Sequence, residues 1–256
     1  MDKSTSMDGN GVPAFIGIDL GWYGKPSGLA VFRWVDRRLQ LGDVVRITAV
    51  SEIRSWIARN AGLGTTVIAV DAPTIIRNPS GIRPAERALN SHFTRFHAGC
   101  YPANLSRPFA NYVLQFSGAL EAMGFAFDTE ISPQGPGRFQ IEVHPHAASV
   151  SLFGLPRILK YKRGRRDVRA AELNRFRNLL LEGLPELEPA VATIDLPRVP
   201  NTGDMKEVED QIDAVLCAYI AAHWWYWGPA RNLLFGDREN GFIVVPSGAR
   251  SPITRR

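Results

Sequence analysis

One aspartate near the N-terminus constrains this chain more than any other residue. Residues 15–20 form an apolar run that predicts a β-strand, and residues 27–32 predict a second strand. Asp19 lies at the end of the first run, between Gly17 and Gly21. Because a buried carboxylate needs a cationic partner or a metal ion, Asp19 is a candidate functional residue. The alternative is an aspartate that only helps to form the Gly-rich turn between the two strands.

A second carboxylate follows another apolar segment. Residues 66–70 read Thr-Val-Ile-Ala-Val, a continuous run typical of a parallel strand that is buried on both faces. Asp71 comes directly after this run, and Pro73 prevents the strand from continuing. Asp71 is therefore a second candidate, and an Asx-turn before the proline is its structural alternative.

Two further carboxylates lie on a predicted late helix over residues 205–225. Asp210 and Asp213 are three residues apart and so share one face of that helix. Acidic residues are also favoured there by the helix dipole alone. If this helix crosses the sheet beside the first and fourth strands, four carboxylates meet at one place. Such a cluster predicts a site for Mg²⁺ or Mn²⁺, and two ions about 4 Å apart can catalyse phosphodiester hydrolysis.

The order of the predicted elements indicates an α/β protein. Three antiparallel strands come first, and strands joined by helices follow. The predicted segments are strands at 15–19, 27–32, 38–47 with a kink at Gly42, 66–70, 139–143 and 241–245, and helices at 51–61, 84–97, 108–123, from His146, after Gly164 and at 205–225. We expect one domain over residues 13–247 with insertions at about 74–135 and 155–203, a disordered lead over 1–12 and a polar tail over 248–256.

The bulk composition favours a cytoplasmic protein that does not enter a membrane. No apolar stretch reaches the ~20 residues that a membrane span needs, and the first ten residues lack the apolar core of a signal peptide. Cys100 and Cys217 are far apart and outside any CxxC pair, so we expect two reduced thiols. The net charge of +5 is too mild to identify a polyanionic partner by itself.

The acidic motifs resemble those of a known superfamily. The segments at 17–21, 70–73 and 210–214 resemble the RuvC-type branch of the ribonuclease H-like superfamily, in which carboxylates come from the first strand, the fourth strand and a D-x-x-D-A helix. This chain departs from that pattern in having Asp71 where those resolvases have glutamate. The resemblance implies a ribonuclease H-like mixed five-stranded sheet flanked by helices, with helical insertions. It also implies a possible homodimer, because Holliday-junction enzymes of this fold act as dimers.

A closer resemblance is to the domain of unknown function 429 family, whose members are described as predicted ribonuclease H-like nucleases. It rests on the ordered segments at 71–73, 81–87, 142–146, 160–166 and 241–246, and it runs from about Phe15 to Pro246. In a metal-dependent nuclease of this kind, Asp19, Asp71, Asp210 and Asp213 would bind Mg²⁺ or Mn²⁺, and Glu142 would support catalysis.

Several other residues are secondary candidates. Glu142 and His144 end a predicted strand on the same side and are a candidate acid/base or ligand pair, whereas His146 is expected to begin the next helix.

Arg83 and Arg87 are candidates for phosphate binding, with a salt bridge to Glu86 as the alternative. The basic segment 157–177 is either a nucleic-acid contact or a solvated helix face. Its candidate substrate-binding residues are Lys160, Lys162, Arg163, Arg165 and Arg166.

Three functions remain open from the sequence. The leading hypothesis is a metal-dependent nuclease that hydrolyses DNA or RNA. A second is a non-catalytic nucleic-acid-binding or scaffolding protein with the same fold. A third is an ATP-dependent phosphotransferase of the actin-like and sugar-kinase group, although the chain has no second Gly-rich phosphate loop.

Overall fold

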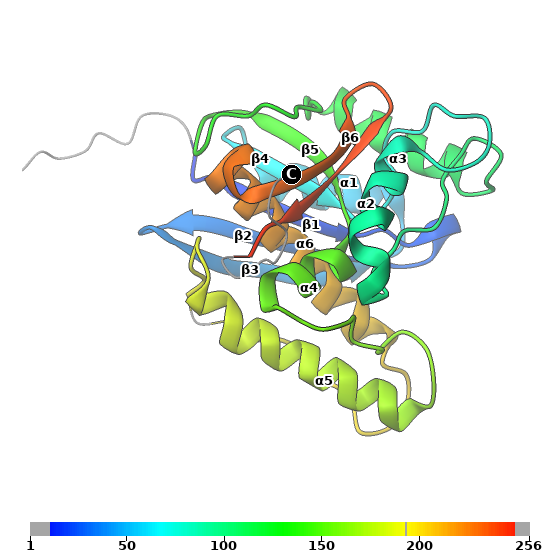
Figure 1. Cartoon of the computed structure of the whole chain (residues 1–256). Helices are drawn as coiled ribbons and strands as arrows, with labels where there is room; N and C mark the ends of the chain where they lie inside the picture. Colours follow the sequence, from blue (N-terminus) through cyan, green and yellow to red (C-terminus); the bar gives the residue numbers. More distant parts are fainter. Residues whose placement is uncertain (1–10, 193, 249–256) are drawn as a thin grey trace, which may run out of the picture.

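A single mixed β-sheet organises the molecule. The computed structural model describes residues 11–192 and 194–248. Seven strands form the sheet in the order β3-β2-β1-β4-β5-β7-β6 (Figure 1). Their bounds are β1 Ala14–Asp19, β2 Ser27–Val35, β3 Arg38–Ile47, β4 Thr66–Val70, β5 Arg138–Val143, β6 Asn232–Asp237 and β7 Gly241–Pro246.

The first three strands form an antiparallel meander, as predicted. β1 pairs with β2, and β2 pairs with β3. The register between β2 and β3 shifts between Ala30 and Phe32, where β3 carries one extra residue near Gly42. This irregularity is a β-bulge, and it confirms the predicted kink.

The parallel part of the sheet contains β1, β4, β5 and β7, and β6 closes the far edge as an antiparallel strand. The predicted α/β class with antiparallel and then parallel strands is confirmed, but the expected five strands are wrong because the sheet has seven. The additional edge strand is β6. It pairs with β7 through a short turn in which the Asp237 carboxylate accepts backbone N–H groups from Glu239 and Asn240.

Helices cover both faces of the sheet. Their bounds are α1 Val50–Ala61, α2 Pro84–Phe93, α3 Ala110–Ala122, α4 Pro145–Phe153, α5 Arg166–Gly183 and α6 Lys206–Trp227. One apolar layer joins α1 and α3 to the sheet, and the other contains α2, α4, α5 and α6. Figure 1 shows α5 lying beyond α4 and α6, in the outermost position on that face. Within the described ranges no helix has the length and hydrophobicity to cross a bilayer.

Short 3₁₀ helices account for several differences from the predicted boundaries. The helix predicted over 84–97 ends at Phe93 and continues as the turn Thr94–Phe96. Further 3₁₀ turns cover Trp22–Gly24, Leu184–Glu186 and Gly228–Arg231. The predicted disordered lead and polar tail fall largely on residues 1–10 and 249–256, which lie outside the described residues.

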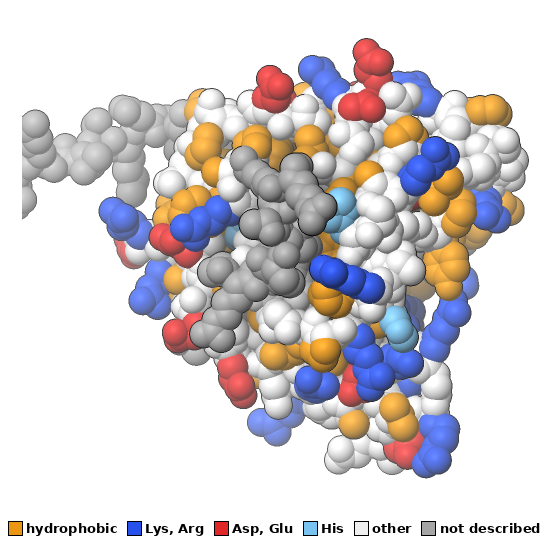
Figure 2. Space-filling view, in the orientation of Figure 1, with side chains coloured by type: hydrophobic (Ala, Val, Ile, Leu, Met, Phe, Trp, Pro, Cys, Tyr) orange, Lys and Arg blue, Asp and Glu red, His pale blue; other side chains and the backbone are white. Residues whose placement is uncertain are grey.

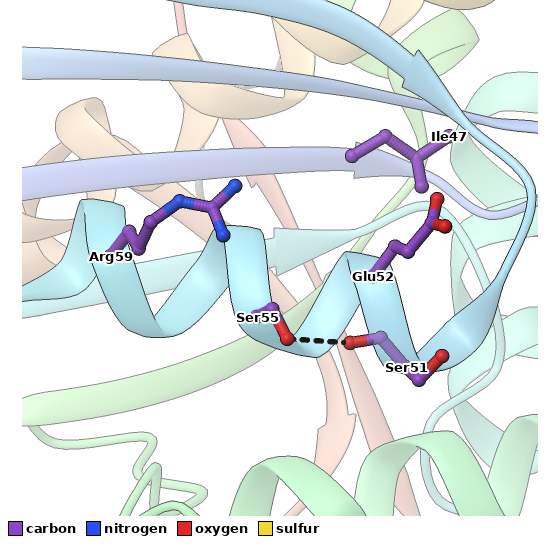
Figure 3. A pocket seen from close by; sticks show the side chains of 5 residues that line it. All are labelled: Ile47, Ser51, Glu52, Ser55 and Arg59. Atoms are coloured by element: carbon purple, nitrogen blue, oxygen red, sulfur yellow. Dashed lines mark hydrogen bonds between the residues drawn. The ribbon is translucent and has the colours of Figure 1, made fainter.

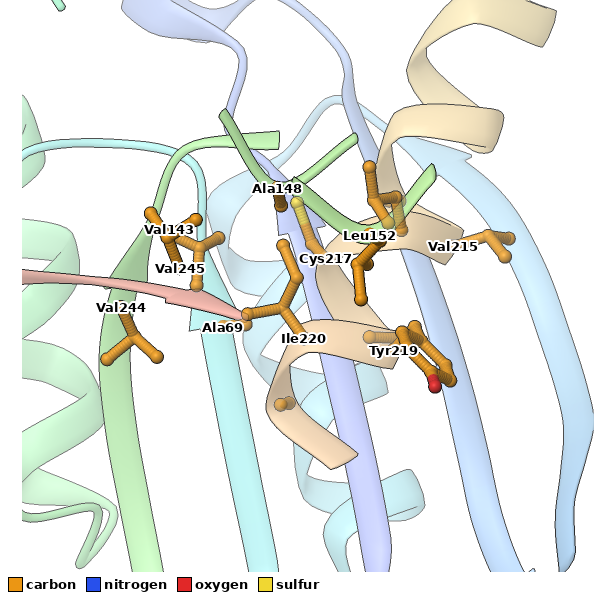
Figure 4. Close-up of a cluster of buried hydrophobic side chains, with 14 of the residues drawn as sticks. Ala69, Val143, Ala148, Leu152, Val215, Cys217, Tyr219, Ile220, Val244 and Val245 are labelled. Carbon is orange, nitrogen blue, oxygen red and sulfur yellow. The ribbon is translucent and has the colours of Figure 1, made fainter. Parts of the chain in front are cut away.

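Helix α6 rests directly on the backbone of the sheet because two glycines leave room for it. A Cβ atom on Gly17 would collide with the carbonyl oxygen of Ala214, and one on Gly28 would collide with that of Asp210. The helix is buried along nearly its whole length. Figure 4 shows Cys217 and Ile220 of α6 packed with Ala69 of β4. The two glycines thereby place the acidic turn of α6 beside the end of β1.

Candidate active site

Two of the predicted acids lie on neighbouring strands at one edge of the sheet. β1 and β4 are parallel, with Ile18 opposite Val70, so their carboxyl ends lie side by side. Asp19 is the last residue of β1, and the Asp71 N–H donates a hydrogen bond to the Ile18 carbonyl at 2.9 Å. Both aspartates are half-buried and keep part of their surface open to solvent. This edge is where ligands bind in open α/β sheets.

Asp213 comes to the same place from α6, and its carboxylate is fully buried. The Tyr161 hydroxyl donates a hydrogen bond to Asp213 Oδ1 at 2.6 Å. Lys162 Nζ lies 2.8 Å from Asp213 Oδ2 as an ion pair. That oxygen nevertheless has no hydrogen bond of good geometry. Asp213 is therefore held by one firm hydrogen bond and retains acceptor capacity on the oxygen that faces Lys162.

Asp19 and Asp71 have no such partners. Within the described residues, neither side chain makes a hydrogen bond or a close ion pair. The pKa of Asp71 is raised to about 7, mainly by burial and also by the charges of Asp213 and Glu142, although the charge of Lys162 opposes this rise. Burial also raises the pKa of Asp19 well above its ordinary value, against Lys162 and with help from Asp213, Asp71 and Asp210. Three carboxylates thus share the field of a single ammonium group.

Asp210 lies beside this group but is already neutralised. Arg46 Nε of β3 lies 2.9 Å from one oxygen, and Lys206 Nζ lies 2.7 Å from the other. Asp210 and Asp213 occupy neighbouring positions on the helix, as the spacing of three predicts, yet they face different cations. We therefore regard Asp19, Asp71 and Asp213, with Lys162 among them, as the core of the site, and we call these three carboxylates the acid triad.

Glu142 belongs to a different cluster. Its two oxygens accept hydrogen bonds from Arg83 Nη2 at 2.6 Å and Nη1 at 2.8 Å. Arg83 is only 1% exposed and also pairs with Glu86 at 2.9 Å. Burial raises the pKa of Glu142 although Arg83 lowers it. Arg83 therefore cannot bind a substrate phosphate, because its donors are buried and bonded to Glu86 and Glu142. Arg87 is exposed.

The two histidines lie near Lys162 and are held neutral. The pKa of His144 is lowered to about 3 and that of His146 to about 4, mainly by burial and in part by the charge of Lys162. Their rings are 5.9 Å apart, and the His146 ring is 5.6 Å from the Tyr161 ring. Within the described residues, His144 Nε2 is buried without a hydrogen bond, and His146 is the histidine whose pKa is affected by the charge of Asp213.

The basic segment 157–177 is largely tied to the protein itself. Arg165 pairs with Asp167 at 2.7 Å, and Arg166 donates to the carbonyls of Pro200 and Gly203. Lys160 and Arg163 are exposed. Lys162 is the member of the predicted set that contacts a triad carboxylate. Tyr161 was absent from the predicted site residues, and the only sequence signal for it is its place beside Lys162 in a loop between Gly154 and Gly164.

The donor chemistry of the triad fits a divalent cation of the Mg²⁺ or Mn²⁺ type. All its donors are carboxylate oxygens, and one of them is buried without a hydrogen bond. In the part of the chain that the structure describes, however, no three His, Cys, Asp or Glu side chains stand close enough together to hold an ion as they are. If all three acids were ionised, three negative charges would face the Lys162 ammonium, and the raised pKa values of Asp19 and Asp71 reflect burial together with this excess of negative charge. A divalent ion therefore fits by charge and donor type, and binding requires the side chains to close around it.

Two surface cavities lie elsewhere and contain none of the predicted site residues. One, of about 310 Å³, is formed by Ile47 at the end of β3 and by α1 residues including Glu52 and Arg59 (Figure 3). Consecutive strand residues point to opposite faces, so Ile47 lies on the face opposite Arg46, which pairs with Asp210. The second, of about 440 Å³, is lined by residues that include Thr74, Arg77 and Arg238.

Comparison with known proteins identifies the family. No curated protein matches the chain. The model for the family described as "Protein of unknown function (DUF429)" matches residues 17–239. The matched range includes all three residues of the acid triad together with Lys162 and Glu142, and it covers most of the chain. The chain therefore belongs to the DUF429 family.

Proposed function

We propose that the chain is a divalent-cation-dependent nuclease that hydrolyses phosphodiester bonds of DNA or RNA. The observation that carries this proposal is the acid triad, in which three desolvated carboxylates at an open sheet edge face one ammonium. Asp19, Asp71 and Asp213 would hold Mg²⁺ or Mn²⁺. Such an ion supplies Lewis-acid stabilisation of the phosphoryl oxygens and lowers the pKa of a bound water.

The residues of the chain would then divide the remaining work. Tyr161 fixes the orientation of Asp213 through its hydroxyl hydrogen bond. Lys162 limits the repulsion among the acids and places a positive charge where a phosphate approaches. His144 and His146 stay neutral because burial lowers the pKa of each, so they add no charge beside Lys162. Asp210 supports the site through Arg46 and Lys206, which reduce the negative charge beside the triad.

Cleavage assays with chelator and added cation test this proposal. Labelled single-stranded and duplex DNA and RNA are incubated with Mg²⁺, with Mn²⁺ or with EDTA. Asp71→Asn and Asp19→Asn should each lower cleavage by about 100-fold or more, because a metal ion contributes several kcal/mol to the transition state. Asp195→Asn, which changes an exposed aspartate, is the matched control and should keep its activity. Undiminished cleavage by Asp71→Asn would contradict the proposal.

One observation favours a second candidate, a nucleic-acid-binding protein without turnover. Lys162 already pairs with Asp213, so the site is partly neutralised without an ion. Thermal unfolding separates the two functions. A cation that binds only the native state and is present at 100 times its dissociation constant raises the free energy of unfolding by about 2.7 kcal/mol. A melting temperature that does not respond to Mg²⁺ or Mn²⁺, together with oligonucleotide binding in EDTA, would favour the non-catalytic function.

A further inference from the structure

Exposed aromatic side chains gather on two loops beside the acid triad. Trp22 is 40% exposed, Tyr23 is 56% exposed and Tyr101 is 79% exposed. The loops that carry them are joined, because the Trp22 ring contacts the Phe109 ring with centroids 4.3 Å apart. We call Trp22, Tyr23 and Tyr101 the aromatic rim. Large apolar side chains left in solvent in this way are typical of a contact surface.

The aromatic rim adjoins the proposed active site. Trp22 follows Asp19 by three residues and begins the turn directly after β1. Tyr101 lies two residues before Ala103, whose N–H donates to Glu86, and Arg83 joins Glu86 to Glu142. Glu142 lies opposite Val70, the residue directly before Asp71, in the parallel pair of β4 and β5. Both loops therefore lead away from the edge of the sheet at which Asp19 and Asp71 lie.

The chain segment that carries Tyr101 is rich in basic side chains. Glu86 is the one acidic residue between residues 72 and 120, and it is buried against Arg83. Arg77 is exposed and has no hydrogen bond or ion pair within the described residues, and Arg107 is exposed with one bond to a carbonyl. The Asn78 carbonyl accepts the Leu105 N–H and thereby connects the segments that carry these arginines. Figure 2 shows Lys and Arg side chains over the side of the molecule where α2 and α3 lie.

We propose that the aromatic rim, with Arg77 and Arg107, binds single-stranded nucleic acid. Unpaired bases stack on aromatic rings while cationic side chains contact the phosphates, and this combination is sequence-tolerant. A duplex offers phosphates but keeps its bases stacked inside, so it gains nothing from the exposed rings. The inference rests on the proposed nuclease function for its purpose, which is to lead a strand toward the acid triad.

Fluorescence anisotropy in EDTA tests binding apart from cleavage. The probes are fluorescein-labelled oligothymidylate, oligouridylate and a mixed-sequence DNA duplex. Tyr101→Ala should weaken binding of the single strands by about 5-fold or more, since a stacked base contributes about 1–3 kcal/mol. Tyr101→Trp should bind as the wild type does. The control is Leu63→Ala, which removes a fully exposed apolar side chain outside the rim and should change nothing.

The arginines give a second, independent measurement. Arg77→Ala and Arg107→Ala should each reduce the slope of log affinity against log salt by about 0.7, as expected for one phosphate contact on a single strand. Arg54→Ala, an exposed arginine on α1, is the matched control and should leave the slope unchanged.

The outcomes separate this inference from the proposed function. Absence of single-strand binding, equal binding of the duplex, or a Tyr101→Ala affinity equal to that of Leu63→Ala would each overturn the role of the rim. Binding that depends on the rim but is followed by no cleavage in Mg²⁺ or Mn²⁺ would contradict the nuclease and support the rim. Cleavage that stays at the wild-type rate in the rim variants would support the nuclease and contradict the role of the rim.

Discussion

The same edge of the sheet carries two clusters of buried charge that are built in opposite ways. In the first, which we call the arginine cluster, Arg83 donates to Glu142 and Glu86, and the Ala103 N–H also donates to Glu86. In the second, the acid triad, Asp213 is the one carboxylate with close partners among the described residues.

This difference distinguishes charges with a structural role from charges that are candidates for a functional role. A buried carboxylate that is paired and hydrogen-bonded is part of the folded structure, because removal of its partner leaves an uncompensated buried charge. One that is desolvated without partners costs stability and is typical of a functional site. Four predictions test or sharpen this comparison.

The largest effect is expected from Arg83→Met. This change keeps an apolar stem but leaves Glu142 and Glu86 buried without their cation, so we expect a loss of about 3–5 kcal/mol in the free energy of unfolding. Urea denaturation followed by circular dichroism measures it. Arg87→Met is the matched control, because Arg87 lies on the same helix and is exposed. Equal stability of the two variants would contradict a structural role for the arginine cluster.

The next prediction is that one substitution in each cluster changes the free energy of unfolding in opposite directions. At pH 8, Glu142→Gln should destabilise the protein by about 2 kcal/mol, because the amide NH₂ group would face an Arg83 donor and the buried guanidinium would lose one of its two anionic partners. Asp71→Asn should instead stabilise it by about 1–2 kcal/mol, because it removes a poorly solvated charge from the acid triad. Thermal and urea unfolding measure both changes. The comparison would fail if both substitutions shifted stability in the same direction.

A smaller effect is expected in the pH dependence of stability. The pKa of Asp71 is raised from 3.8 to about 7 by burial and by Asp213 and Glu142. The folded state therefore holds a proton that the unfolded state releases, and this contribution is fully present below pH 3.8 and lost as the pH rises through about 7. On the order of 2 kcal/mol should disappear in this window. The wild-type curve minus the Asp71→Asn curve isolates the effect from that of the two histidines.

The smallest effect is expected from Arg165→Ala. Arg165 is 83% exposed and its partner Asp167 is 62% exposed, so water and salt screen the pair. The melting temperature and the oligonucleotide affinity should both stay at wild-type values. A clear loss of oligonucleotide affinity would instead indicate that the basic segment 157–177 contacts nucleic acid.

The positions of the acids could be predicted from the sequence because each follows from a local pattern. Asp19 and Asp71 end apolar runs, and parallel strands bring such ends together. Asp210 and Asp213 are placed by helical spacing. β6 was missed because its residues follow the aromatic end of α6 without a clear alternation of apolar and polar side chains.

The partners of the acids could not be predicted. Glu142 and Arg83 are 59 residues apart, and Asp213 and Tyr161 are 52 apart. Nothing in the local sequence of either residue specifies such a contact, because it depends on how the loops pack. For the same reason, the sequence does not predict that arginines of segment 157–177 donate hydrogen bonds to backbone carbonyls, as Arg166 and Arg177 do.

The contact of α6 with Gly17 has a consequence for the evolution of this molecule. Since main chain meets main chain there, the separation between Asp213 and the strand ends is fixed by atoms that every amino acid shares. Exchanging side chains in the surrounding apolar layers would alter stability but would leave that separation nearly unchanged. Relatives that have drifted far in their core are therefore free to keep the same spacing of acids, provided that Gly17 and Gly28 both stay glycine.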